Sequence, residues 1–225
     1  MQSSSIAGRP VVVFGAGGAL GSGVASAMAG AGAVVTGADK VMPPASRRLA
    51  GVHYEAVDVL DDDAVGALLD AVQTPWAVLN TIGGFAPARP FAELDHAELV
   101  GQLELNLVTA ALITKHALRI MQAAGEGRIV HTASRAAVVT AGTGFAYSVS
   151  KAGVLHLVAM AAGEVRGTDV TVNCVVPSII DTPANREAMP KADHDAWPKV
   201  EDIARAFLFL TQPESRLVNG AALPV

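Results

Sequence analysis

The stretch that most constrains the fold is residues 10–38, which carry no charged side chain. A β-branched run, VVVF, leads into the glycine turn GAGGALGSG, followed by the alanine-rich VASAMAGAG and a second β-branched run, AVVTGA. The span is long enough to cross a bilayer, but its eight glycines would make a weak membrane helix. The pattern instead predicts a strand, a tight turn, a helix and a second strand.

The same alternation continues along the chain and predicts the fold class. Further strands are expected at residues 52–59, 76–82, 127–134, 169–180 and 218–225, with helices between most of them. The strands are apolar throughout, which is typical of a parallel sheet covered on both faces. We therefore predict an α/β fold, a Rossmann-type doubly wound, mainly parallel sheet flanked by helices on both faces, in a single domain over residues 1–225.

Composition and charge narrow the class of partner. The net charge of -5, without a basic cluster beyond Arg47 and Arg48, disfavours nucleic acid or an anionic membrane surface. Cys174 is the only cysteine, which excludes an intramolecular disulfide and a Cys-based zinc site. The first residues show no signal-peptide pattern. We expect a cytoplasmic protein with a small-molecule partner, no membrane association and no metal.

The glycine turn at residues 15–21 has the features of a dinucleotide site. Glycines let the backbone approach a pyrophosphate, and the helix N-terminus that follows favours its charge. Asp39 ends the second strand at the distance expected for a carboxylate that binds the adenosine ribose. Because such an acid repels a 2′-phosphate, NAD(H) is favoured, while the adjacent Lys40 keeps NADP(H) as an alternative. The Lys-[Ser/Thr] ending of a phosphate-transferring P-loop is lacking.

A second group of reactive side chains lies between residues 134 and 151. Tyr147 and Lys151 stand four residues apart at the start of an apolar run, so on a helix they share one face. A cation one turn away stabilises a phenolate, which predicts that Lys151 lowers the pKa of Tyr147. Ser134 could hold an oxygen on which charge develops. This spacing of Tyr and Lys also arises by chance, so the pair alone does not establish catalysis.

Several polar and small residues fall at the carboxyl ends of predicted strands, where ligands of such sheets bind. We expect them to converge on one crevice. They are Gly15, Asp39, Asn80, Ser134 and Pro177.

These motifs, in this order, resemble the short-chain dehydrogenase/reductase family in its single-domain form over essentially the whole chain. The YxxxK pair, the serine before it and a helix asparagine form the family's catalytic set, here Asn106, Ser134, Tyr147 and Lys151. The glycine turn resembles the family's TGxxxGxG and is more similar still to that of dihydropteridine reductase.

The resemblance also implies a cofactor site. Asp58 matches an adenine-contacting aspartate, Asn80 and Gly83 match the NNAG turn, written NTIG here, and Ser178 stands where relatives carry glycine in a PGxxxT stretch that holds the nicotinamide amide. The implied cofactor-binding residues are Gly15, Gly17, Gly18, Ala19, Leu20, Gly21, Asp39, Lys40, Asp58, Val59, Asn80, Gly83, Tyr147, Lys151, Pro177, Ser178, Ile180 and Thr182.

The family mechanism gives each catalytic residue an expected role. Hydride passes between the nicotinamide and a carbonyl carbon while Tyr147 exchanges a proton with the oxygen that Ser134 holds. Lys151 is implied to bind the nicotinamide ribose, and Asn106 to position a water for proton supply. A pterin or quinone reductase of the same family, or a non-catalytic NAD(P)-binding scaffold, are the alternatives. Extended epimerases are disfavoured because no length remains for their substrate domain.

The polar, proline-punctuated residues 181–198 are predicted to form a substrate lid, with an ordinary surface loop as the alternative. The resemblance further implies a homo-oligomer, a dimer or tetramer formed through the helices that carry Asn106 and Tyr147. The substrate, a carbonyl compound or alcohol, has as candidate pocket residues Phe85, Arg135, Phe145, Ser178, Arg186 and Trp197.

Overall fold

A single parallel sheet forms the centre of the molecule. The computed structural model describes residues 5–85, 89–139 and 144–225, so part of the stretch just before Tyr147 lies outside the described residues. Its seven strands follow the order β3-β2-β1-β4-β5-β6-β7 and pair in parallel throughout. The strands are β1 Pro10–Phe14, β2 Val34–Asp39, β3 Val52–Ala56, β4 Ala77–Asn80, β5 Glu126–Thr132, β6 Asp169–Val176 and β7 Ala222–Pro224.

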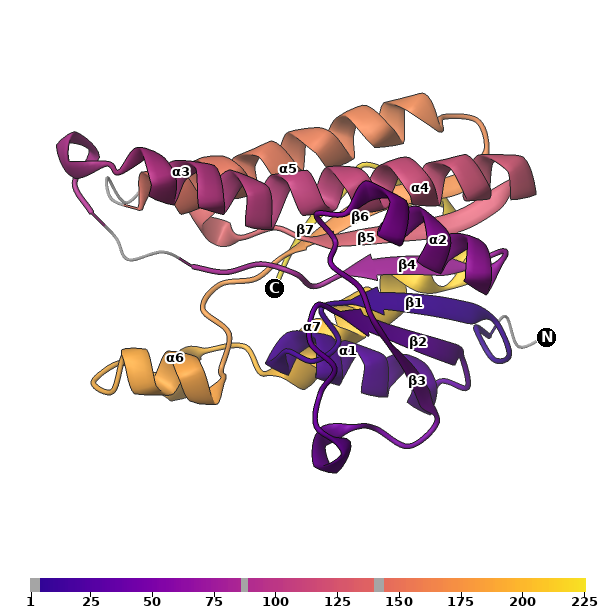
Figure 1. Ribbon diagram of the computed structural model, residues 1–225, viewed down its shortest axis with the longest axis horizontal. Helices are drawn as coiled ribbons and strands as arrows, with labels where there is room; N and C mark the ends of the chain where they lie inside the picture. The colour runs from indigo at the N-terminus through magenta and orange to yellow at the C-terminus, as the bar shows by residue number, and fades with distance from the viewer. Residues whose placement is uncertain (1–4, 86–88, 140–143) are drawn as a thin grey trace.

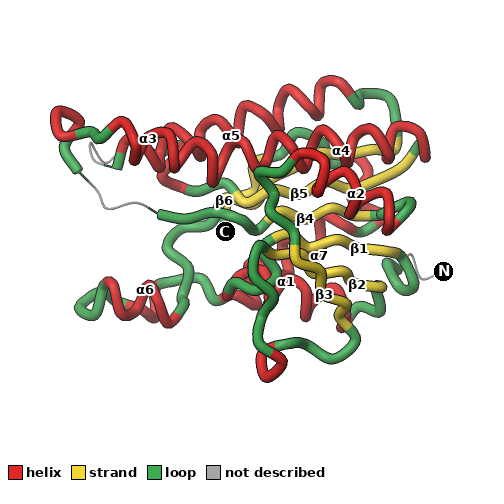
Figure 2. The backbone as a smooth tube through the Cα atoms, in the orientation of Figure 1, coloured by secondary structure: helices red, strands yellow, loops and turns green. Residues whose placement is uncertain are grey.

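Helices cover both faces of this sheet, which confirms the predicted doubly wound α/β class (Figures 1 and 2). One face carries α1 (Ala19–Gly30) and α7 (Val200–Thr211), which pack on each other. The other carries α2 (Asp62–Val72), α4 (Thr109–Ala124) and α5 (Phe145–Glu164). Each layer buries its own apolar cluster against the sheet, so the two faces are separately held by the hydrophobic effect.

Successive strands are added to opposite sides of β1, and this change of side positions the candidate binding site. β2 and β3 extend the sheet to one side of β1, while β4 to β7 extend it to the other. Loops leaving the carboxyl ends of β1 and β4 therefore run to opposite sides and leave a binding crevice between them. The uncharged stretch at residues 10–38 forms β1, α1 and most of β2, as predicted.

Three predicted elements differ from the structure. β3 ends at Ala56, because Asp58 opens a turn in which its backbone carbonyl accepts from the amide of Asp61. Between β4 and β5, where the alternation predicts helix, the chain forms α3 (His96–Leu103), a π-helical turn (Glu104–Val108) and α4. β6 stops at Val176, before Pro177, since proline has no N–H to donate to a ladder.

The predicted lid contains its own short helix. Within residues 181–198, α6 (Pro183–Ala188) projects from the body of the molecule (Figure 1). The segment leaves and returns at one point, where Asp181 and Lys199 form a parallel bridge. Two side chains order it locally: Arg186 forms a two-point ion pair with Asp181, and His194 stacks on Trp197.

Helix α5 is long and apolar enough to cross a membrane by length and composition. It packs instead against β6, α3 and the π-helical turn, which makes it a core helix of this sheet protein. Small residues lie on both its buried and its exposed side, for example Ala146 and Ala159.

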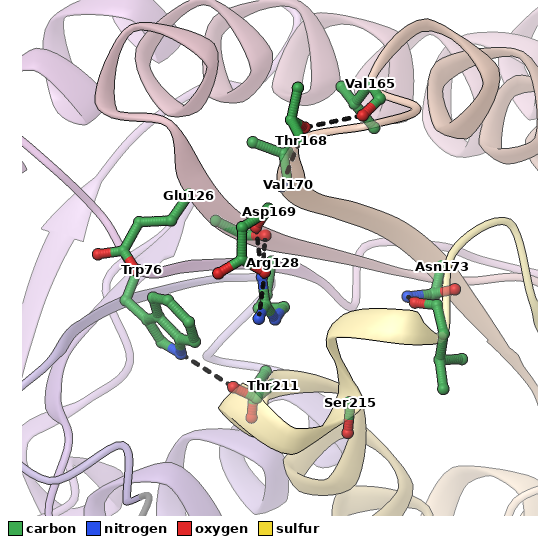
Figure 3. A network of polar contacts seen from close by, with 12 residues as sticks. Trp76, Glu126, Arg128, Val165, Thr168, Asp169, Val170, Asn173, Thr211 and Ser215 are labelled. Carbon is green, nitrogen blue, oxygen red and sulfur yellow. Dashed lines mark hydrogen bonds and ion pairs between the residues drawn. The ribbon is translucent and has the colours of Figure 1, made fainter.

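The amino end of the sheet is held by an unusual buried cation (Figure 3). Arg128 is fully buried; it donates to the backbone carbonyl and the carboxylate of Asp169, and its guanidinium lies 4.5 Å from the Trp76 ring centroid. Arg9 lies on the same ring at 3.6 Å, and the Trp76 indole N–H donates to the carbonyl of Thr211. A buried charge needs such partners. This cluster lies at the sheet end opposite the predicted site and joins β4, β5, β6 and α7.

Candidate active site

The glycine turn lies between β1 and α1. Close contacts within it leave no room for side chains at Gly15 and Gly21. Gly15 has a φ of 82°, and a Cβ on Gly21 would lie 2.0 Å from the Gly15 carbonyl oxygen. Gly18 is the N-cap of α1, and no side chain caps the first turn of that helix. Leu20 is buried under the turn and anchors it to the core. The helix N-terminus thus presents backbone N–H groups beside the crevice.

The acid at the end of β2 supports this turn. A side-chain oxygen of Asp39 accepts a hydrogen bond from the Gly17 amide at 2.9 Å, and a Cβ on Gly17 would come within 3.0 Å of that oxygen. Asp39 also lines a cavity of about 240 Å³ together with Lys40, Asp58 and Val59. The sequence-predicted adenosine residues are therefore brought to one cavity.

The turn after β4 is held by a buried hydrogen-bond chain. The Asn80 side-chain oxygen accepts from the Ile82 amide at 3.0 Å, and its amide nitrogen lies 3.2 Å from His131 Nδ1. His131 Nε2 lies 2.8 Å from the Thr114 hydroxyl, which itself donates to the Ala110 carbonyl. The hydroxyl must therefore accept from Nε2–H, which leaves Nδ1 to accept from Asn80. Burial lowers the pKa of His131 to about 3, so the ring is neutral.

Ser134 and Tyr147 meet at the carboxyl end of β5. The Ser134 hydroxyl caps the turn at Arg135–Ala137 by accepting from the Ala136 amide at 3.2 Å. Burial raises the pKa of Tyr147, and a hydrogen bond with Ser134 acts in the opposite direction. The Tyr147 ring packs edge-to-face on Phe85 with centroids 5.2 Å apart. Hydroxyls from a strand end and from a helix start thus face each other.

Lys151 lies one helical turn beyond Tyr147 and is 3% exposed. Its ammonium donates to the Thr132 backbone carbonyl at 2.9 Å, and burial lowers its pKa to about 8. Lys151 is not among the groups that shift the pKa of Tyr147, which burial raises. The net shift of the Tyr147 pKa is therefore opposite to the predicted one, because burial disfavours the charged phenolate.

Asn106 is buried in the π-helical turn, not solvent-facing. Its side-chain oxygen accepts from the Gly84 amide at 3.2 Å, and its amide nitrogen donates to the Ser150 hydroxyl at 3.0 Å. A Cβ on Gly83 would lie 2.7 Å from Lys151 Nζ and 2.9 Å from Asn106 Oδ1. Gly83, Asn106 and Lys151 therefore converge in one small volume.

The residues after β6 lie beside Ser134 through the backbone. The Pro177 carbonyl accepts from the Arg135 amide at 2.9 Å, and the Ser178 amide donates to the carbonyl of Val225. Gln73 is the only non-glycine with positive φ among the described residues, so Ser178 needs no glycine geometry. Thr182 caps α6 by accepting from the Asn185 amide, and Asn185 donates to the Ile180 carbonyl.

The candidate substrate residues divide into two groups. Phe85, 68% exposed, lies against Tyr147, and Phe145 packs edge-to-face on Phe91 at 4.6 Å. Arg186 and Trp197 instead contact their own segment, residues 181–198. Phe85 thus lies against Tyr147 and Phe145 in the helix that carries it, while Arg135 directly follows Ser134 and its amide donates to the Pro177 carbonyl.

These residues fit a dinucleotide. The glycine turn, which has no room for side chains, and the uncapped N-terminus of α1 suit a pyrophosphate. The cavity lined by Asp39 and Asp58 suits an adenosine. Gly83, between Lys151 and Asn106, leaves room for a ligand edge that a side chain would exclude.

Sequence reasoning missed three supporting residues. Thr81 donates from its hydroxyl to the Phe14 carbonyl at 2.7 Å, beneath the glycine turn. Ser150 receives the Asn106 amide, and His131 holds Asn80. The available signal was a histidine in an otherwise apolar predicted strand, three residues before Ser134.

Comparisons with known proteins agree with this geometry. A family profile described as enoyl-(acyl carrier protein) reductase matches residues 15–225. The chain is 35% identical to cis-4-hydroxycyclohexanecarboxylate dehydrogenase of Sinomonas cyclohexanicum, over 100% of this chain and 97% of that protein. The chain belongs to the short-chain dehydrogenase/reductase family.

Other members of the short-chain dehydrogenase/reductase family extend the likeness. The chain is 31% identical to D-threitol dehydrogenase of Mycolicibacterium smegmatis, over 97% of this chain and 91% of that one. A short-chain type dehydrogenase/reductase from Mycobacterium ulcerans superposes with a TM-score of 0.90 at 27% identity, covering 98% of this chain and 89% of that chain. The protein is thus an oxidoreductase of a family whose members bind NAD(P)(H) and act on small molecules.

Proposed function

We propose that this oxidoreductase interconverts a secondary alcohol and its carbonyl compound with NAD(H), using Tyr147 as the proton carrier. The observation that carries the proposal is that Lys151 and Asn106 are buried and converge around Gly83, one helical turn from Tyr147, while Ser134 lies at the end of the neighbouring strand. Bound NAD(H) would supply or accept the hydride.

The chain's own residues would orient the reacting oxygen and move its proton. Ser134 holds the oxygen by its hydroxyl, and Tyr147 donates or accepts the proton at its phenolic oxygen. Lys151, one helical turn from Tyr147, would bind ribose hydroxyls and, by its positive charge, favour the phenolate that forms when Tyr147 gives up its proton. Asn106, whose side-chain oxygen accepts from the Gly84 amide, would position a water that links Lys151 to solvent for proton supply.

The aromatic surroundings support an apolar, ring-bearing substrate. Phe85 is exposed beside Tyr147, and Val138 and Val139, which follow Ser134 closely, are 61% and 54% exposed. Exposed apolar side chains next to reactive hydroxyls favour carbon rings over polyanions. Relatives named for cyclohexane carboxylate and borneol agree with this choice.

Residues 181–198 serve in this proposal as the lid. The Asp181 to Lys199 bridge lets the segment move as one unit about a fixed point. We expect closure to bring α6 over the substrate, and deletion of the segment to raise KM for the alcohol more than for NAD.

The outer faces of α4 and α5 support a dimer or tetramer. Val108, Val149 and Met160 are 38%, 39% and 64% exposed, and a groove of about 600 Å³ between the helices is lined by Leu118 and Leu157 among others. Light scattering after gel filtration would give the mass. A cytoplasmic location remains the proposal, in keeping with one buried free cysteine, Cys174.

The test is turnover of purified protein with NAD+ and NADP+ against cyclic, linear and polyhydroxylated secondary alcohols, and of NADH against the matching ketones. We expect cyclic alcohols with NAD+ to give the highest kcat/KM. NADH binding without oxidation by any ketone, quinone or pterin would overturn the proposal and favour a binding protein.

A further inference from the structure

The adenosine cavity carries an uneven set of charges. Among the described residues that line it, Asp39, Asp58 and Glu104 are anionic, and Lys40 is the sole cation. A 2′-phosphate on the adenosine ribose would bring about two further negative charges, so Lys40 is the one lining group that could offset them. Whether its ammonium is available decides the choice of cofactor.

Lys40 is held by Asp58. Its ammonium lies 2.8 Å from one carboxylate oxygen of Asp58, across the gap between the ends of β2 and β3. The other oxygen of that carboxylate accepts from the Leu60 amide at 3.1 Å. Asp58 is thus fixed by the backbone of its own turn, and the long, 69% exposed lysine side chain is the partner that adjusts.

Asp39 is fixed as well, but by the glycine turn. One of its oxygens accepts from the Gly17 amide at 2.9 Å, so it stays close to the phosphate-binding backbone. Neither carboxylate can therefore move aside readily, and each acts on a different part of the cavity.

We propose that Asp58 is a specificity-determining residue that selects NAD(H) by holding the Lys40 ammonium away from a ribose 2′-phosphate. The selection then depends on two acids: Asp39 repels the phosphate directly, and Asp58 withdraws the cation that would bind it. The inference rests on the proposed use of a nicotinamide dinucleotide. The Leu60 amide and the Lys40 ion pair also lower the pKa of Asp58, which keeps it charged when it binds the lysine.

Asp58→Asn separates these roles because it keeps an oxygen for the Leu60 amide while it removes the charge that holds Lys40. The measurement is the dissociation constant of NADH and of NADPH, from nicotinamide fluorescence, which needs no turnover. We expect the ratio of the two constants to move about fivefold or more toward NADPH. Asp63→Asn removes the same charge from the exposed first turn of α2 and serves as the matched control, with an unchanged ratio.

A third variant identifies the path of the effect. Combining Asp58→Asn with Lys40→Met should return the ratio to the wild-type value, because no ammonium is left to bind the phosphate. If the double variant keeps the gain, or if Asp58→Asn changes both constants equally, Asp58 does not act through Lys40 and the inference is wrong. If wild-type protein binds neither NADH nor NADPH, the proposed function is wrong, and so is this inference, which depends on it.

Discussion

The two ends of the cofactor crevice use charge in opposite ways. At the proposed catalytic end, Ser134, Lys151 and Asn106 are buried, and burial lowers the pKa of Lys151 to about 8. At the adenosine end, Lys40 and Asp58 are 69% and 43% exposed and are paired in solvent. Burial makes single charges energetically large, whereas exposure makes them small and adjustable. In the proposed function, the chemistry would therefore use strong electrostatic effects at buried groups, and the choice of cofactor would use weaker, adjustable ones at exposed groups.

The largest effect is expected from Tyr147→Phe, which tests whether the buried end of the crevice carries the chemistry. The ring should stay packed on Phe85 while the proton carrier is lost, so we expect kcat to fall by about 10²- to 10⁴-fold. The dissociation constant of NADH should change little. Steady-state turnover together with a fluorescence titration separates these effects, and full activity in the variant would remove Tyr147 from the mechanism.

A smaller effect is expected from Gly83→Ala. The new methyl would lie 2.7 Å from Lys151 Nζ and 2.9 Å from Asn106 Oδ1, and both groups would have to shift. We expect kcat/KM to fall by about 10- to 100-fold, since misplacement by an ångström costs that much. Gly30→Ala, at the exposed end of α1 with nothing within 4 Å of the added carbon, is the control. Equal effects of the two substitutions would contradict a crowded catalytic end.

The pH profile tests the buried lysine next. Burial lowers the pKa of Lys151 to about 8, so its charge is present below that pH and is lost as the pH rises through it. The pKa of Tyr147 is raised, so its proton remains available over the same range. Carbonyl reduction should thus decline above about pH 8, by roughly tenfold at the limit. A flat kcat/KM profile from pH 6 to 10 would show that the lysine charge is not needed.

The last prediction concerns stability rather than rate. The pKa of His131 is about 3 in the folded protein and about 6.5 when unfolded, so the unfolded state binds the extra proton first. His131 therefore contributes stability above about pH 6.5 that is lost progressively down to about pH 3, by at most about 1.4 kcal/mol per pH unit. His131→Asn should flatten that slope in urea titrations at several pH values, whatever its offset at pH 7. An identical slope in the variant would mean that His131 already titrates in the folded state.

Much of the fold followed from local patterns that do not need tertiary context. The charge-free run before Asp39 predicted β1, α1 and most of β2 because glycine turns and β-branched runs act over a few residues. Spacing also placed Tyr147 and Lys151 on one helix and brought Ser134 to a strand end.

What could not be predicted depends on contacts between distant residues. The extent to which Tyr147 is buried, which raises its pKa, cannot be read from residue spacing, and neither can the donation of Lys151 to the Thr132 carbonyl. The pairing of Lys40 with Asp58 requires two neighbouring strands in register. Likewise, the π-helical turn between α3 and α4 accompanies the hydrogen bonds of Asn106 with Gly84 and Ser150, which the sequence pattern does not reveal.

The π-helical turn at Glu104–Val108 has a consequence for how this helix tolerates change in length. A π turn holds one more residue than a regular turn, so deletion of a single residue there can restore an unbroken α-helix. Such a shortened protein would gain regular backbone hydrogen bonds and withdraw the Asn106 amide from Gly84. If Asn106 has its proposed role, activity and stability would then move in opposite directions, and the extra residue would be retained for the chemistry at the expense of a more regular helix.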